Sequence, residues 1–184
     1  AGTYTFNYQI CEALNPTNCK TAAISVTVVA DPVVATADTV TGVNGVTGNP
    51  SAVNLFTGDT INGSPATASN STLSLAPAAT LPSVLTFDPA TGVVGVKANT
   101  PAGTYTFDYQ ICETLNPTNC KTATASVTVD AATIVATADS VTGINGATGA
   151  TSVVNAFTSD TIGAAAASAS NAVLICHALS GHHH

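Results

Sequence analysis

The chain repeats itself, and this repetition limits what it can fold into. Residues 2–22, GTYTFNYQICEALNPTNCKTA, return as residues 103–123, GTYTFDYQICETLNPTNCKTA, so that residue 2 corresponds to residue 103. The same offset of 101 residues relates VVATAD at 33–38 to IVATAD at 134–139, and FTGDTI at 56–61 to FTSDTI at 157–162. A repeat of this length is the size of an ordinary domain and exceeds the roughly 20 to 50 residues of a solenoid unit. The sequence therefore predicts a string of domains, which we call beads.

The 184 residues contain one complete bead and a part of a bead on each side of it. Residues 1–30 match the closing part of one bead, residues 31–130 make a complete bead, and residues 131–176 match the opening part of the next. Residues 77–101 have no counterpart in either flanking segment. Residues 177–184 are interpreted as a tail, because LSGHHH reads as a cloning scar and the start of a purification tag.

Apolar and polar side chains in the complete bead alternate with the period of a β-strand. Residues 104–111 and 121–129 each place aromatic or aliphatic side chains on one face and mainly threonines on the other. Shorter runs, separated by turn signals such as Asn62-Gly63, predict further strands at 33–37, 39–43, 52–56, 72–76, 84–87 and 93–97. About seven or eight strands in about 100 residues are typical of an antiparallel immunoglobulin-like β-sandwich. The expected inner layer contains Tyr105, Phe107, Tyr109, Phe56, Phe87 and Leu85.

Cysteine spacing predicts one disulfide in each copy of the hairpin. Cys112 and Cys120 have the same parity as the outward residues of their strands, so they can face each other across the hairpin, and Cys11 and Cys19 repeat the arrangement. Free thiols or half of a metal site are the alternatives. A disulfide places the protein in an oxidising, extracellular compartment. Cys176, beside His177 where the repeat breaks down, is interpreted as a free thiol.

The composition argues against nucleic acid and membranes as partners. Charged residues make up only 7% of the chain, the formal net charge is -7, and the three cationic side chains are all lysines. A phosphate backbone or an anionic lipid surface would find few groups to bind. The sequence contains no apolar run near the 18 or more residues of a membrane span, so membrane insertion is not expected.

The stretch LPSVLTFDPATGVVGV at 81–96, followed by PAGTYTFDYQIC at 101–112, resembles the immunoglobulin-like repeat of bacterial surface proteins, in which LPxGLxFDxxTGxIxG leads to a GTYxF strand. VVATADTV, NLFTGDTINGSP and YQICETLNPTNCKTATASVTV are similar to tandem repeats of giant secreted adhesins from gliding bacteria, exported by the type IX route. The resemblance implies a sandwich fold and a stalk-like role. Relatives carry an acidic residue after the second cysteine, where this chain has Lys20 and Lys121.

The sequence offers little for catalysis. The only histidines are His177 and those of the tag, so no Ser-His-Asp or Cys-His arrangement fits within a bead, and we predict no enzyme and no cofactor. Calcium binding is the alternative to the absence of a cofactor, because a set of aspartates recurs in two copies of the repeat. However, the sequence contains no cluster that would supply the six to eight oxygen ligands of calcium. Asp59 and Asp160 are otherwise interpreted as turn caps that bond nearby backbone N–H groups. The calcium candidates are Asp38, Asp59, Asp139 and Asp160.

These observations predict a non-enzymatic structural spacer of an extracellular bacterial adhesin or filament, which projects a binding tip from the cell. The alternative is a ligand-binding adhesin module that recognises glycan or protein through loops such as residues 113–119. Its partners are expected to be neighbouring repeats of the same polypeptide. The unfinished ends add one more expectation: residues 1–29 of one molecule dock on residues 133–174 of another, because each leaves an apolar face without its partner.

Overall fold

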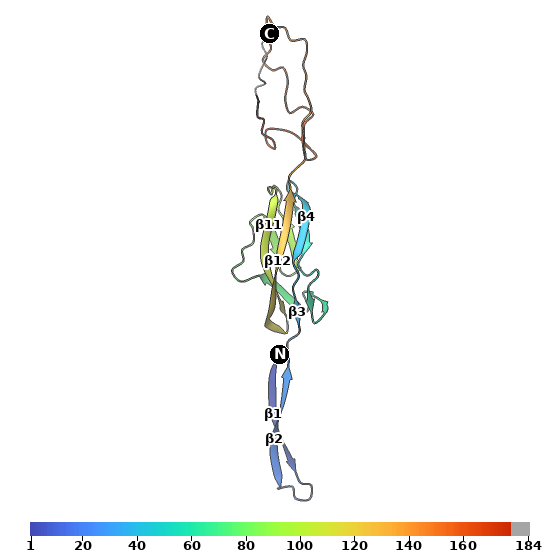
Figure 1. The fold of residues 1–184 in the computed structure, drawn as a ribbon, viewed down its shortest axis with the longest axis vertical. Coiled ribbons are helices and arrows are strands. Elements are labelled where there is room, and N and C mark those ends of the chain that lie inside the picture. The colour runs from blue at the N-terminus through green and yellow to red at the C-terminus, as the bar shows by residue number, and fades with distance from the viewer. Residues whose placement is uncertain (178–184) are drawn as a thin grey trace. The chain divides into compact units, whose positions relative to one another are not determined.

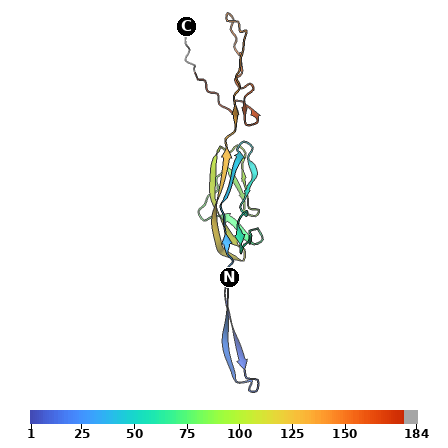
Figure 2. The same ribbon diagram turned by 45° about the vertical axis from the view of Figure 1, so that its right-hand side comes forward.

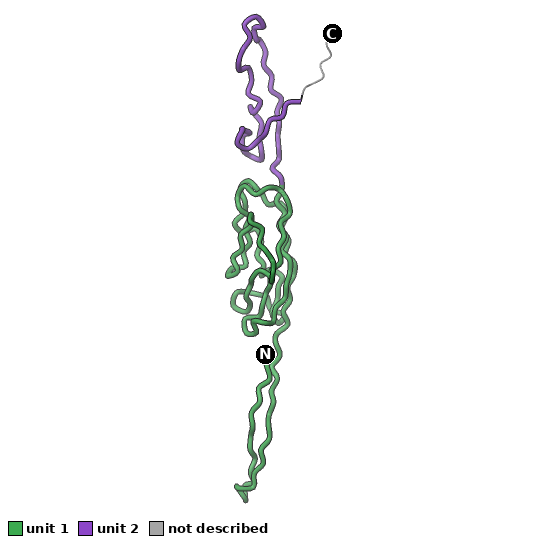
Figure 3. Tube along the Cα trace, turned by 90° about the vertical axis from the view of Figure 1, so that its left-hand side faces the viewer, with its two compact units in different colours: residues 1–130 green, residues 131–184 purple. Residues whose placement is uncertain are grey.

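The computed structural model describes residues 1–177, and the strands in it form five small antiparallel or mixed sheets. No helix long and apolar enough to cross a membrane occurs in this described part. The chain divides into two compact units between Asp130 and Ala131 (Figure 3). The strands of the first unit are β1 (Gly2–Cys11), β2 (Cys19–Val28), β3 (Val33–Val34), β4 (Asp38–Asn44), β5 (Asn49–Asn54), β6 (Thr60–Ile61), β7 (Ser64–Pro65), β8 (Ser71–Leu75), β9 (Leu85–Asp88), β10 (Val93–Val96), β11 (Gly103–Glu113) and β12 (Asn116–Asp130).

The complete bead is a sandwich of two main sheets. One has the strand order β4-β12-β11-β8 and the other β5-β10-β9, while β3, β6 and β7 form a small third sheet (Figure 1). The predicted β-sandwich is therefore confirmed. One pairing departs from an all-antiparallel arrangement, because β4 runs parallel to β12. Parallel neighbours need a long crossover, and the whole of the bead between β4 and β12 supplies it.

The β11–β12 hairpin alternates as its sequence predicts. Phe107, Tyr109 and Ile111 are buried, and so are Ala125, Val127 and Val129 on the paired strand. The threonines between them point outward. The hydroxyls of Thr104 and Thr128 form a hydrogen bond of 3.1 Å, and Thr3 and Thr27 form the equivalent bond of 3.0 Å in the first hairpin. The alternation of apolar and polar side chains thus determines which face of the hairpin the second sheet covers.

The core lies between the two sheets. Leu55 and Val94 are fully buried, Leu85 nearly so, and the rings of Phe87 and Phe107 pack with centroids 6.1 Å apart. Phe56, Phe87 and Tyr105 are partly buried at its margin. The expected inner layer is therefore present, with Leu55, Val94 and Ile111 as further buried members.

Two short strands, β6 and β7, were not expected. They are joined by Asn62-Gly63, whose φ angles of 51° and 74° are both positive. A two-residue hairpin turn of type I′ requires positive φ at both central residues, and Asn-Gly meets this need with little strain. The turn signal was visible in the sequence, but its flanking residues do not alternate over a long enough run to predict strands.

The β1–β2 hairpin has the same register as β11–β12 but no covering sheet. Cys11 pairs with Cys19 just as Cys112 pairs with Cys120. In the described structure β1 and β2 form a sheet of only two strands, without counterparts of β4 and β8 (Figure 2). As a result, Phe6 is 56% exposed, whereas its counterpart Phe107 is 5% exposed.

The second unit, described up to residue 177, keeps only the small sheet of the bead. Its strands are β13 (Ile134–Val135), β14 (Thr161–Ile162) and β15 (Ala165–Ala166). They pair in the order β13-β14-β15, which repeats β3-β6-β7. The counterparts of β4 and β5, at 139–145 and 150–155, have no strand structure, and the strands that pair with β4 and β5 in the bead have no counterpart in this unit.

The paired phenylalanines give a direct test of the core. We expect Phe107→Ala to reduce the free energy of unfolding of the bead by about 3 to 5 kcal/mol, because it removes a buried ring and leaves a cavity. Phe6→Ala, in the same local sequence, should change it by less than about 0.5 kcal/mol. Denaturant unfolding of dilute protein measures both. Equal effects from the two substitutions would contradict the burial described here.

Candidate functional site

The tip of the hairpin is a cross-linked turn that occurs twice. Disulfides join Cys11 to Cys19 and Cys112 to Cys120. In the bead, β11 extends to Glu113 and β12 begins at Asn116, so the connection is shorter than the predicted loop 113–119. The extra pairing comes from a register shift after Cys112, which lets Glu113 pair with Asn116.

A carboxylate organises each tip. The Glu113 carboxylate accepts hydrogen bonds from the side-chain amides of Asn116 at 2.6 Å and Asn119 at 2.8 Å. Glu12 accepts the equivalent bonds from Asn15 and Asn18, at 2.6 and 2.9 Å. These bonds, led by those from Asn119 and Asn18, lower the pKa of both glutamates. The spacing Glu-x-x-Asn-x-x-Asn therefore builds a side-chain network inside the turn, which the prediction of a ligand-gripping loop did not include.

The bead's hairpin tip also holds the segment that leads into the bead. The backbone N–H of Asp31 donates to Glu113 at 3.2 Å, and the amide of Asn119 donates to the backbone carbonyl of Asp31 at 2.6 Å. Glu113 is buried in spite of its charge. A buried carboxylate with three donors is a stable arrangement, so the entry segment is fixed to the tip of β11 and β12.

A second polar cluster lies inside the sandwich around Tyr109. Asp59 is 1% exposed; its carboxylate accepts a bond from the Thr36 N–H at 2.7 Å and one from the Tyr109 hydroxyl at 3.0 Å. The hydroxyl also lies 2.9 Å from the carbonyl oxygen of Thr36. Burial and the nearby carboxylates raise the pKa of Tyr109, so it stays a donor. The cluster ties β11 to the connection between β3 and β4.

The turn-cap interpretation of Asp59 is corrected by this geometry. Its N–H partner, Thr36, precedes it by 23 residues, so the bond links two distant segments and not the ends of a turn. Asp160 repeats the contact with the N–H of Thr137 at 2.6 Å. The recurrence of Thr, Tyr and Asp in both copies was the available signal, but the sequence does not show that they meet.

Of the predicted calcium residues, Asp38 and Asp59 lie close together in the bead. Asp38 is buried beside this cluster and its Oδ2 has no hydrogen-bond partner. Burial, with the charge of Asp59 as a smaller cause, raises its pKa from 3.8 to about 6. Asp139 and Asp160 lie in the second unit. Residues 1–177 contain no group of three or more His, Cys, Asp or Glu side chains arranged to hold a metal ion.

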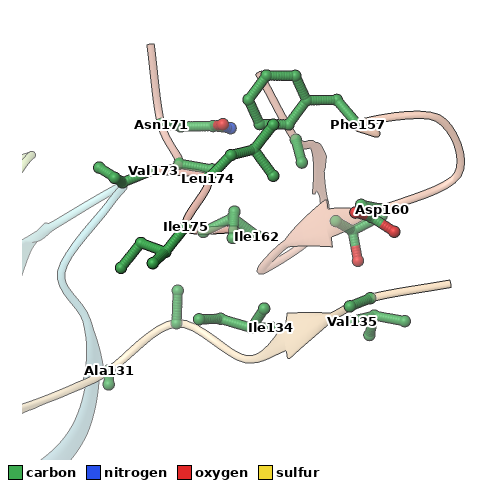
Figure 4. Close-up of a pocket in the computed structure, with 15 residues that line it drawn as sticks. Ala131, Ile134, Val135, Phe157, Asp160, Ile162, Asn171, Val173, Leu174 and Ile175 are labelled. Atoms are coloured by element: carbon green, nitrogen blue, oxygen red, sulfur yellow. The ribbon is translucent and has the colours of Figure 1, made fainter. Parts of the chain in front are cut away.

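The second unit carries an apolar groove, which lies mainly in residues 133–174, the segment whose apolar face was expected to lack a partner. It encloses about 620 Å³, and Figure 4 shows the residues that line it. Ile134, Phe157, Ile162, Ala167 and Leu174 have counterparts in the core or core margin of the complete bead, whereas Val135, Val173 and Ile175 correspond to exposed residues. Cys176 and His177, at the end of the described chain, are exposed, and Cys176 is a free thiol. The lining includes Ile134, Phe157, Asp160, Ile162, Ala167 and Leu174.

Neither a family model nor a curated protein matches the sequence. Among solved structures, the chain is similar to protocadherin gamma B2 extracellular cadherin domains 1–5, with a TM-score of 0.41 and 13% identity over 74% of this chain and 28% of that one. The human desmocollin-1 ectodomain gives a TM-score of 0.41 and 13% identity over 66% and 24% of the two chains. The chain thus spans about a quarter of these structures. The fold assignment rests on the sheets described above.

Asp38 makes the stability of the bead depend on pH. A carboxyl group whose pKa rises on folding favours the folded state while it is protonated, so stability should fall as the pH rises from about 4 to about 6. Asp38→Asn should reduce this fall, because the amide does not ionise, and the part that remains comes from Asp59, whose pKa burial also raises. Thermal unfolding across this range measures it, with Asp139→Asn as the exposed control. An unchanged pH profile in Asp38→Asn would contradict the assignment.

The two disulfides should differ in their effect on unfolding. In the chain-entropy model, a loop of about nine residues contributes about 2.5 kcal/mol. We expect replacement of Cys112 and Cys120 by alanine to lower the free energy of unfolding of the bead by about that amount. The same change at Cys11 and Cys19 should leave bead unfolding nearly unaltered, because that hairpin adds no side chain to the bead's buried core. Denaturant titration of the two double variants, each with one intact disulfide, tests the difference.

Proposed function

We propose that the chain is a run of spacer modules from an extracellular bacterial surface adhesin or filament, whose role is to carry load between the cell and a binding tip. The observation that carries the proposal is the parallel pairing of β4, near the entry of the bead, with β12, its last strand. The repeated sequence supports a tandem arrangement, in which residues 1–30 close one bead, 31–130 form the next and 131–176 open a third. The bacterial origin rests on the sequence resemblance.

The β4–β12 pairing suits a module that is pulled from its ends. Asp38 lies opposite Ala125 and Asn44 opposite Asp130, so both strands run toward the exit of the bead. Tension pulls β4 back toward its beginning and β12 forward toward its end. The hydrogen bonds between them are then loaded together in shear, and they must fail together. A hairpin pulled open from its strand ends loses its bonds one at a time.

Other features of the bead support the same role. The bonds between Asp31, Glu113 and Asn119 fix the entry segment to the hairpin tip. The Cys112–Cys120 disulfide prevents that tip from opening. Disulfides persist in oxidising compartments, which supports an extracellular location. The glutamate, asparagine and cysteines of these contacts recur as Glu12, Asn18, Cys11 and Cys19, whereas Ala132 takes the place of Asp31.

Recognition of a ligand by the hairpin tips is the second candidate. Leu14 and Leu115 are about 90% and 85% exposed at the two tips, and a cavity of about 220 Å³ lies between Asp31, Asn70 and Leu115. The Glu113 carboxylate already has three donors, so a partner would have to be bound through apolar contact. A glycan or protein array probed with the whole chain and with the Leu14→Ser/Leu115→Ser variant distinguishes a binder from a spacer.

Pulling the same folded protein in two directions tests the spacer role. Single-molecule tension applied at the chain ends should unfold the bead at a distinctly higher force than tension applied through handles at Thr104 and Thr128. The second geometry opens the antiparallel β11–β12 pair from one end, where these two threonines face each other. Equal unfolding forces in the two directions would contradict a load-bearing role for β4 and β12.

A further inference from the structure

The chain carries the two complementary parts of a bead at its opposite ends. The β1–β2 hairpin repeats β11–β12, and its inner face lies open. Tyr8 and Ile10 are 45% and 68% exposed, whereas Tyr109 and Ile111 are fully buried. In water this face exposes several large apolar side chains in a row, which favours association. The face consists of Tyr4, Phe6, Tyr8, Ile10, Ile24, Val26 and Val28.

The groove of the second unit is the surface that such a hairpin covers in the complete bead. Ile134 is 71% exposed and Leu174 55% exposed, while their counterparts Val33 and Leu73 are each 6% exposed. In the bead, Val33 and Leu73 belong to one buried core together with Phe107, Tyr109 and Ile111 of β11. The groove therefore has the chemistry of a core from which β11 and β12 have been removed.

We propose that the β1–β2 hairpin of one molecule docks into the groove of residues 131–177 of a second copy of this chain. The complete bead supplies the register of the contact. β1 lies beside residues 172–176, as β11 lies beside β8, with Ile10 opposite Leu174. β2 lies beside residues 139–145, as β12 lies beside β4, with Val26 opposite Val141. Both segments lack strand structure in the second unit and gain a hydrogen-bonded neighbour.

The polar anchor of this contact is already in place in the groove. In the bead, Asp59 holds the Thr36 N–H with one oxygen and the Tyr109 hydroxyl with the other. In the second unit, the Asp160 carboxylate accepts a hydrogen bond from the Thr137 N–H in the same way, and Asp160 lines the groove (Figure 4). Tyr8, the counterpart of Tyr109, then donates its hydroxyl to Asp160. This bond gives the docking a defined position along the groove.

Glycine packing supports the same contact. A Cβ atom on Gly45 would lie 2.8 Å from the Val129 side chain and 2.1 Å from the Thr100 carbonyl oxygen, so the bead requires glycine there. Gly146, its counterpart, has nothing within 4 Å in the second unit. Docking places Val28, the counterpart of Val129, over Gly146. Thr100 has no counterpart in the rebuilt bead, so Val28 is the one of these two neighbours that docking supplies.

Two changes in side-chain size offset each other across the proposed interface. On the inner face, the docking hairpin differs from β11–β12 at one position, where Ile24 replaces the fully buried Ala125. In the second unit, Ala156 replaces the fully buried Leu55. The hairpin gains three carbon atoms and the second unit loses three. Two valine to isoleucine changes, at positions 134 and 144, add one carbon each, and small opposing changes of this kind are tolerated in a core.

The rebuilt bead lacks the strands that correspond to β9 and β10, because residues 77–101 have no counterpart in the two segments. In the bead these strands contribute Leu85, Val94 and Val96 to the core. The interface is therefore weaker than the packing inside a bead, and it depends on protein concentration. It joins two different surfaces of the chain, so it is heterologous and produces open head-to-tail chains or closed rings.

Solution mass across a wide concentration range tests the docking with the whole chain. Sedimentation velocity or light scattering should show the mean mass rising with concentration. Phe6→Asp places a charge on the docking face and should keep the chain monomeric, while Thr5→Asp, on the opposite face of the same strand, should associate as the parent chain does. A parent chain that stays monomeric at every concentration, or equal behaviour of the two variants, overturns the proposal.

A cross-link tests the register. In the bead, Tyr109 lies opposite Leu75, so Tyr8 is predicted to lie opposite the free Cys176 of the second copy. Under mild oxidation, Tyr8→Cys should form covalent oligomers that peptide mapping assigns to a bond between position 8 and Cys176. Thr3→Cys, on the outer face and far from that position, should cross-link at least tenfold less. Equal cross-linking of the two variants, or none in either, overturns the predicted register.

Discussion

Burial of the inner face of β11 is the interaction on which the rest of the bead depends. Phe107, Tyr109 and Ile111 reach the core only because β5, β9 and β10 cover them and β4 and β8 flank their sheet. Almost the same sequence in β1 forms the same hairpin with the same register, so pairing and the turn need no covering layer. Hydrophobic burial, and not local β-propensity, therefore separates a bead from an isolated hairpin.

The polar contacts form only when this face is buried, and they specify the register of β11 within the bead. Tyr109 enters the core with a hydroxyl that requires a partner, and Asp59 and Thr36 provide it from segments 50 and 73 residues away in the sequence. A register slip of one residue would turn Tyr109 outward and leave Asp59 buried without this donor. Asp38, in contrast, has a buried Oδ2 without a hydrogen-bond partner, and burial disfavours the charged form of its carboxyl group. The cluster thus specifies one arrangement of β11 and leaves the bead sensitive to pH.

Local patterns in the sequence predicted the local parts of the structure. Period-two alternation identified both strands of the hairpin and its buried face, and cysteine parity gave the pairing of Cys112 with Cys120 that the structure contains. The network of Glu113 with Asn116 and Asn119 lies within seven residues, but the alternation that identifies strands does not extend into the turn and so gives no signal of it. The parallel β4–β12 pair and the Asp59–Tyr109 bond join segments far apart in the chain, and a single sequence carries no signal of which distant residues meet.

The same contacts that close a bead within one chain are available between chains. A bead of this type is completed by its last hairpin, which carries half of the inner face and the tyrosine that finds Asp59. In this chain the β1–β2 hairpin and the groove of residues 131–177 correspond to these two parts, with Tyr8 on the hairpin and Asp160 in the groove. Because strand pairing and core packing do not require that the two parts share a chain, complementation follows from the repeat itself. The register inside the complete bead then determines the register between molecules.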